Sequence, residues 1–108
     1  MDNIMSLEIN LDNNGLLTIQ LPSTLDAVNA SNMIETSISA VSGNVESIQI
    51  EMSATTFMDS AGVGCIVKLY RKSKEYNIDM KLIGAHGQPL SLIQSLQIDR
   101  VIEVQLAD

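Results

Sequence analysis

The sequence is poor in the side chains from which metal sites, disulfide frameworks and aromatic binding surfaces are built. Its 108 residues include one Cys, one His, one Phe, two Tyr and no Trp. Cys65 has no second cysteine with which to form an internal disulfide. One Cys and one His also fall short of the four ligands of a structural zinc site. The composition therefore excludes a disulfide scaffold and a zinc module, and we expect no metal and no cofactor.

Basic residues are scarce as well, since six Lys and Arg stand against thirteen Asp and Glu, for a net charge of −7. Four of the six lie in the segment 68–74, so the rest of the chain has two basic and thirteen acidic residues, a charge of −11. Such a body repels nucleic acid and anionic lipid, and it offers few aromatic rings for base stacking. The charge keeps a small domain in solution, and it also suits a partner with a basic surface.

Long apolar runs are absent too. No stretch approaches the roughly 20 apolar residues of a membrane helix. Residues 1–11 contain Asp2 and Glu8 but none of the basic residues with which a signal peptide begins. Together with the free cysteine, this predicts a cytoplasmic protein that does not insert into a membrane.

What is present is the pattern of one folded domain spanning residues 1–108, with 45% apolar residues. The run Asp-Asn-Asn-Gly at 12–15 predicts a turn that joins the first two strands in a hairpin. Alternating apolar residues predict strands at 5–11, 17–21, 48–52, 78–82 and 102–106, and apolar residues three or four apart predict helices at 26–41, 60–76 and 89–96.

The predicted order is β-β-α-β-α-β-α-β, an α/β fold with a mixed, mostly parallel sheet of about five strands. Parallel strands covered on both faces are continuous apolar runs, whereas these strands alternate. We therefore expect three or more helices mainly on one face, with the strands following one another across the sheet in one direction. Such a sheet lacks the reversal of strand order at which open α/β sheets bind cofactors, which argues against a nucleotide enzyme.

The segment 51–64 is the most informative because it ends in a helix start. Asp59 or Ser60 makes a good N-cap there, which is a purely structural role. Gly62 and Gly64 each cost about 1 kcal/mol of helix stability relative to Ala, so either close packing or a partner should require them. A serine at this point is also a favourable phosphorylation position, since free N–H groups and the helix dipole tolerate an anion.

The same segment resembles the signature of the STAS domain, the fold of bacterial anti-sigma factor antagonists. That family ends its strand in an acidic residue, here Glu51, and opens the helix with Asp-Ser-[Ser/Ala]-Gly-[Leu/Val]-Gly, here residues 59–64. Residues 23–26, Ser-Thr-Leu-Asp, resemble its Gly-Glu-Leu-Asp, and residues 98–102, Ile-Asp-Arg-Val-Ile, resemble its Leu-Asp-Arg-Leu-Phe. The resemblance spans nearly the whole chain.

The resemblance implies a binding module under phosphorylation control rather than an enzyme. A cognate anti-sigma factor, which is an ATP-dependent serine kinase, would phosphorylate Ser60, and a metal-dependent serine phosphatase would remove the phosphate. The unphosphorylated form would bind the anti-sigma factor and free the sigma factor. The residues expected at the partner-binding surface are Asp26, Met58, Asp59, Ala61, Gly62 and Val63.

The chain departs from the family pattern at three places, which predicts a changed choice of partner. Ser23 and Thr24 replace the usual Gly and Glu, Gln97 replaces a Gly, and residues 86–89, His-Gly-Gln-Pro, replace a Ser-Pro pair. An alternative is therefore a STAS subunit that docks onto a transporter or another assembly without phosphorylation. Its interface would be the uncovered sheet face or the first helix.

Enzymatic interpretations have weaker support. Residues 62–67 match only part of a dinucleotide fingerprint, because Val67 stands where the third Gly belongs. A Ser-His-Asp site would need His86 beside Ser60, and the chain has no Gly-x-Ser-x-Gly elbow. We expect Cys65 to be a packing residue, and the basic segment 68–74 to be a solvated helix face with kinase docking as its alternative.

Overall fold

The computed structural model describes residues 8–107. The predicted strand at 5–11 is seen from Glu8 onward, and its first residues, including Met5 and Leu7, lie outside the described part. The elements in chain order are β1 (Glu8–Leu11), β2 (Leu16–Gln20), β3 (Thr24–Leu25), α1 (Ala27–Ala40), β4 (Ser47–Glu51), β5 (Phe57–Met58), α2 (Ser60–Glu75), β6 (Asp79–Ala85), α3 (Gly87–Ser95), the 3-10 turn η1 (Ile98–Arg100) and β7 (Glu103–Leu106).

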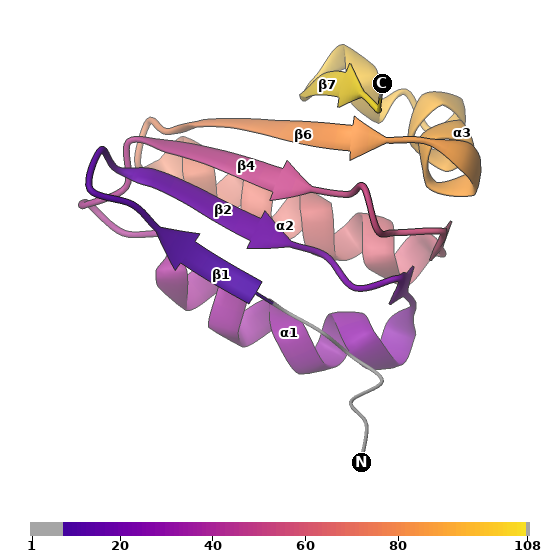
Figure 1. Cartoon of the computed structure of the whole chain (residues 1–108), viewed down its shortest axis with the longest axis horizontal. Helices are drawn as coiled ribbons and strands as arrows, with labels where there is room; N and C mark the ends of the chain where they lie inside the picture. Colours follow the sequence, from indigo (N-terminus) through magenta and orange to yellow (C-terminus); the bar gives the residue numbers. More distant parts are fainter. Residues whose placement is uncertain (1–7, 108) are drawn as a thin grey trace.

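The main sheet has the order β1-β2-β4-β6-β7, so the strands follow one another across it in one direction, as predicted. β1 and β2 form the antiparallel hairpin, and the other neighbouring pairs are parallel. Helices α1 and α2 cover one face, while α3 lies at the carboxyl end of β6 (Figure 1). The fold is therefore the α/β arrangement that the alternating strands indicated.

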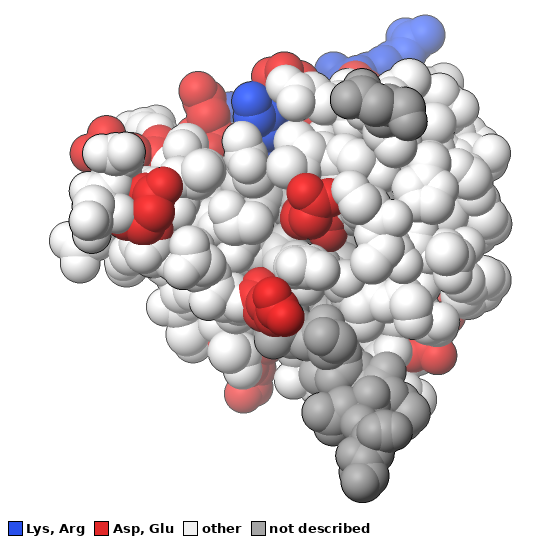
Figure 2. Space-filling view, viewed as in Figure 1, with Lys and Arg blue, Asp and Glu red and all other residues white. Residues whose placement is uncertain are grey.

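The core lies between this sheet and the two long helices. Strand residues alternate between the core and the uncovered face, so Ile19 and Ile50 are buried while Thr18 and Gln49 are half-buried. On the uncovered face, acidic side chains are scattered among uncharged ones, and basic ones show only toward the edge formed by β6 and β7 (Figure 2).

The buried face of α2 differs from the one that its apolar spacing predicts, which consists of Val63, Ile66, Val67 and Tyr70. Val63, Ile66 and Leu69 are buried, whereas Val67 and Tyr70 are only half-buried. The difference arises because α2 packs against α1 at its side as well as against the sheet beneath it.

A second, two-stranded parallel sheet was not predicted. It pairs β3 with β5, placing Thr24 opposite Phe57 and Leu25 opposite Met58. Each strand immediately precedes a helix, so this small sheet holds the starts of α1 and α2 next to each other. Within residues 8–107, none of the helices has the length and apolar character needed to cross a membrane.

Candidate functional site

The start of α2 is capped by Asp59, one of the two residues that the sequence offered for this role. The Asp59 carboxylate accepts the backbone N–H of Ala61 at 3.0 Å and that of Gly62 at 3.1 Å. The Asp59 carbonyl accepts the N–H of Val63 at 3.1 Å. Ser60 is thus the first residue of the helix, and it is exposed.

The Ser60 hydroxyl forms no hydrogen bond to any residue in the described range 8–107, so modifying it would break no hydrogen bond there. The expectation of free N–H groups waiting for a phosphate needs revision, however, because Asp59 already occupies two of them. A phosphate on Ser60 would be attracted by the helix dipole but repelled by the adjacent carboxylate. It would therefore project outward and change the surface more than the fold.

The start of α1 repeats this arrangement beside it. Asp26 caps α1 and accepts the N–H of Asn29 at 3.0 Å, and the Asn29 side chain donates to the carbonyl of Thr24 at 2.7 Å. The N–H of Asp59 donates to the carbonyl of Leu25 at 3.3 Å, which ties the two helix starts together. The two acidic caps, Asp26 and Asp59, thus each follow one strand of the short β3–β5 ladder.

Gly62 is required by this close approach. A Cβ atom at Gly62 would overlap the carbonyl oxygen of Leu25 and come within 2.7 Å of Cγ of Met58. Gly64 differs, since a Cβ there would meet nothing within 4 Å. Of the two explanations for these glycines, close packing therefore accounts for Gly62, while Gly64 faces open space.

That open space is a groove of about 360 Å³ between α1 and α2. Ala61, the residue after Ser60, forms part of its wall, and most of its lining residues have small side chains. Burial raises the pKa of the Cys65 thiol to about 11, and nearby Lys68 opposes this in part. Cys65 is thus a packing residue and a poor nucleophile at neutral pH. The lining residues are Ala27, Ala30, Ser31, Ile34, Ala61, Gly64, Cys65 and Lys68.

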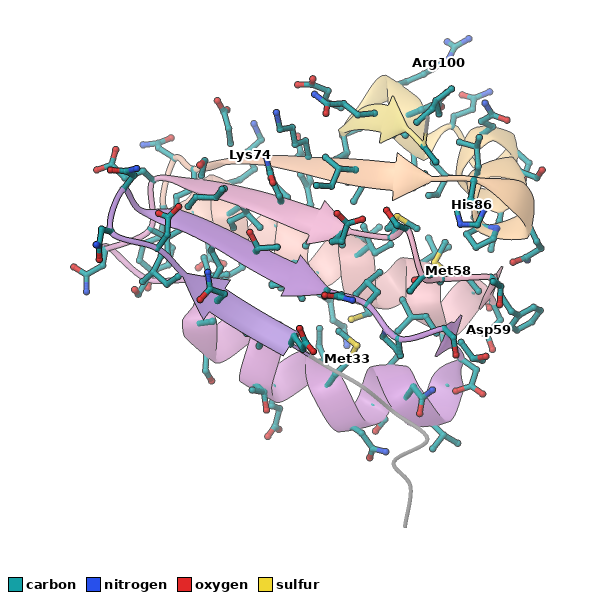
Figure 3. The ribbon with its side chains drawn as sticks, in the orientation of Figure 1. Met33, Met58, Asp59, Lys74, His86 and Arg100 are labelled. Carbon is teal, nitrogen blue, oxygen red and sulfur yellow. The ribbon has the colours of Figure 1, made fainter. Side chains whose placement is uncertain are left out.

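The segment before the site, residues 52–58, is held by its own Thr55 and by two side chains from the start of α3. The hydroxyl of Thr55 is buried and donates to the carbonyl of Pro22 at 2.8 Å. Nε2 of His86 lies 2.8 Å from the carbonyl oxygen of Ser53, and the side-chain amide of Gln88 bonds the backbone of Met58. Met58, Asp59 and His86 accordingly lie at the same end of the molecule (Figure 3).

The sequence profile of the STAS domain matches residues 9–107, nearly the whole chain. The chain belongs to the STAS domain family. No curated protein sequence matches this STAS domain.

Solved structures show the same fold at low identity. The Bacillus anti-sigma factor antagonist SpoIIAA is 20% identical in both its unphosphorylated and its phosphorylated form, with TM-scores of 0.69 and 0.68. The alignments cover 89% and 92% of this STAS domain and 97% and 90% of SpoIIAA. An anti-sigma factor antagonist from Mycobacterium paratuberculosis is 16% identical over 94% of this chain and 85% of its own, with a TM-score of 0.82. The murine anion transporter Slc26a9 is 18% identical over 87% of this chain and 16% of its own, with a TM-score of 0.73.

The predicted partner-binding residues of this STAS domain fall into two groups. Asp26, Asp59 and Ala61 lie at or near the surface, together with Ser60. The other three, Met58, Gly62 and Val63, are buried. Because these three are buried, they support the helix start from beneath, and their contribution to a partner-binding surface stays a prediction.

The remaining candidate residues lie apart from Ser60. No hydrogen bond joins His86 to Ser60 within the described part of the chain, and His86 instead contacts Ser53. The basic residues Lys68, Arg71 and Lys74 are exposed on α2, and Lys74 lies toward its far end (Figure 3). Among residues 8–107, no three His, Cys, Asp or Glu side chains gather where they would hold a metal ion.

The side chains that hold the site but were not predicted from the sequence share one property. Each forms a hydrogen bond with the backbone of a segment that is distant in the sequence. Thr55 reaches Pro22, and Gln88 reaches Met58. The substitution of the Ser-Pro pair by residues 86–89 was visible in the sequence, but nothing there showed that Gln88 binds the segment before Ser60.

Proposed function

We propose that this STAS domain is a phosphorylation-controlled binding module of the anti-sigma factor antagonist kind. Its unphosphorylated form binds an anti-sigma factor that is also a serine kinase, and phosphorylation of Ser60 blocks that binding. A serine phosphatase restores the binding form. The kinase needs ATP, so the proposal assigns the protein to the cytoplasm.

One observation carries the proposal: Ser60 is exposed at the first position of α2, and its hydroxyl has no partner among residues 8–107. A kinase reaches such a hydroxyl without unfolding the domain. The likeness to SpoIIAA, solved in both phosphorylation states, supports the same assignment.

The electrostatics support a switch. A phosphate adds about −1.5 to −2 charges next to the carboxylate of Asp59, with Asp26 on the neighbouring helix start. Burying such a charge unpaired in an interface costs several kcal/mol, which corresponds to more than a hundredfold in affinity. The groove between α1 and α2 is lined by Ala61, the residue after Ser60, and offers the partner a place to pack.

The test uses an anti-sigma factor serine kinase from the same genome that binds this protein, with ATP and mass spectrometry of the products. Phosphate should appear on Ser60 and be lost in Ser60→Ala. Ser31→Ala is the matched control, because Ser31 is an exposed helical serine that lines the same groove. Phosphate on Ser31 instead of Ser60, or no phosphate with a kinase that binds the protein, would contradict the proposal.

The second candidate function is docking onto a transporter or another assembly without phosphorylation. The likeness to part of the anion transporter Slc26a9 favours it. The interface would be the uncovered sheet face or α1. Copurification with a membrane complex, with Ser60 unmodified and Ser60→Asp binding as tightly as the natural protein, would select this function.

A further inference from the structure

β5 is a two-residue strand with only one strand partner. On one side it pairs with β3, since the N–H of Phe57 donates to Ser23 and the N–H of Asp59 donates to Leu25. The N–H and C=O of Met58 point to the opposite side, because successive residues of a strand face alternate directions. A strand this short and this close to the surface would leave that edge open.

The side chain of Gln88 fills the open edge. Its Oε1 accepts the N–H of Met58 at 2.8 Å, and its Nε2 donates to the carbonyl of Met58 at 2.7 Å. The two partners fix the orientation of the amide, since only an oxygen accepts from an N–H and only an NH₂ group donates to a carbonyl. One side-chain amide thus pairs with Met58 as a neighbouring strand residue would.

We propose that Gln88 is a positioning residue for Ser60. Met58 is the last residue of β5, Asp59 is the cap of α2, and Ser60 is the first residue of the helix. With its side chain in the core and both backbone groups bound to Gln88, Met58 fixes the peptide from which Asp59 and Ser60 continue. This inference rests on the proposed function of Ser60 and adds to it a residue on α3.

Gln88 lies on a helix that is distant in the sequence from the segment it holds. Gln88 belongs to α3, thirty residues beyond Met58, and lies at an exposed place on that helix. His86, at the start of α3, bonds Ser53 at the other end of the same segment. The start of α3 therefore holds both ends of the segment that leads to Ser60, so a change at His86 or Gln88 would shift that segment.

The first test needs only the isolated protein. Gln88→Ala removes both bonds, and Gln88→Glu keeps an acceptor for the N–H of Met58 but offers no donor to its carbonyl. Because water replaces the lost bonds at an exposed edge, we expect little change in thermal stability. The amide hydrogen of Met58 should exchange about tenfold faster in Gln88→Ala, with Ile50 and Leu82 in the main sheet unchanged. Gln94→Ala, at an exposed position of the same helix, is the control and should change nothing.

The second test measures phosphorylation of Ser60 by the same kinase as in the test of the proposed function. We expect the kcat for Gln88→Ala to fall several-fold, about threefold to tenfold, with KM nearly unchanged, since the hydroxyl is misplaced while the docking surface remains. Unchanged exchange at Met58 would overturn the inference, and so would equal rates for the natural protein and Gln88→Ala. Failure of the proposed function is distinguishable, because it appears as absence of phosphate in the natural protein, which overturns both.

Discussion

The starts of α1 and α2 lie side by side and are built from the same parts. Each has a two-residue strand of the β3–β5 ladder, an aspartate cap and then the helix. The differences lie in the first turn. α1 begins with Ala27 and carries Asn29 at its third position, whereas α2 begins with Ser60 and carries Gly62 there.

These differences separate a helix start that is tied to its strand from one that carries the hydroxyl of the proposed function. Asn29 bonds back to Thr24, so the first turn of α1 is tied to its own strand. Gly62 has no side chain that could do this, and the lack of a side chain at this position lets α2 approach β3 closely. The hydroxyl of Ser60 forms no hydrogen bond among residues 8–107. The comparison shows that one frame ties the first turn of α1 to its own strand and leaves an exposed hydroxyl at the start of α2.

The largest expected effect comes from filling the space that Gly62 leaves empty. Gly62→Ala should lower the free energy of unfolding by about 1–3 kcal/mol, because the new methyl group overlaps the Leu25 carbonyl. Gly64→Ala is the matched control, two residues along the same helix and facing open space. It should raise that free energy by about 0.5–1 kcal/mol through helix propensity. Urea unfolding measures both, and equal effects from the two variants would contradict this account of the packing.

The second prediction concerns charge at the first position of each helix. Ser60→Asp should weaken binding of the partner kinase at least about tenfold, because it places a carboxylate in the proposed interface. Ala27→Asp adds the same charge at the equivalent position of α1 and should weaken binding less. Titration calorimetry measures the affinities. Both variants should keep unfolding free energies within about 0.5 kcal/mol of the natural protein, since both positions are exposed. An equal loss of affinity in the two variants would show that net charge acts, rather than the position of Ser60.

The third prediction tests the two caps. Asp59→Ala should cost about 1–2 kcal/mol of unfolding free energy, since Asp59 accepts two backbone N–H groups. Asp26→Ala should cost about 0.5–1 kcal/mol, since Asp26 accepts one. The variants Asp59→Asn and Asp26→Asn keep an acceptor oxygen and should recover most of each loss. Urea denaturation checks the order, and a larger loss at Asp26 would reverse the comparison.

The sequence predicts most of this frame, and its failures have a physical reason. The sequence predicts the five strands of the main sheet and the helices, because their apolar residues repeat over several turns or pleats. The β3–β5 ladder was not, because a strand of two residues contains no period. Side-chain bonds to distant backbone, such as that from Gln88 to Met58, depend on the finished topology and leave no local pattern.

The candidate site shows the same division. The motif around Ser60 offers Asp59 or Ser60 as the cap of the helix, and Asp59 takes that role. The family resemblance places Met58 and Gly62 at the partner-binding surface, and no local pattern shows that both are buried. At Gln97 the structure accounts for a departure that the sequence showed without its reason. The family pattern that the chain resembles has a glycine at this position. The φ angle of Gln97 is +61°, in the left-handed region that glycine adopts most readily.

The smallest expected effect distinguishes the interiors of the two helices rather than their starts. Ser37 of α1 and Ser73 of α2 are both fully buried. The Ser73 hydroxyl donates to the carbonyl of Tyr70 at 2.6 Å, whereas the Ser37 hydroxyl has no hydrogen-bond partner among the described residues.

A buried hydroxyl without a partner costs free energy, and its removal costs none of the bonds that hold the fold. Ser37→Ala should therefore raise the free energy of unfolding by about 0.5–1.5 kcal/mol, while Ser73→Ala should leave it unchanged or lower it by up to about 1 kcal/mol. Thermal and urea unfolding measure the difference in sign. A loss of stability in Ser37→Ala would mean that this hydroxyl has a partner, such as a bound water, and that the two helix interiors are alike.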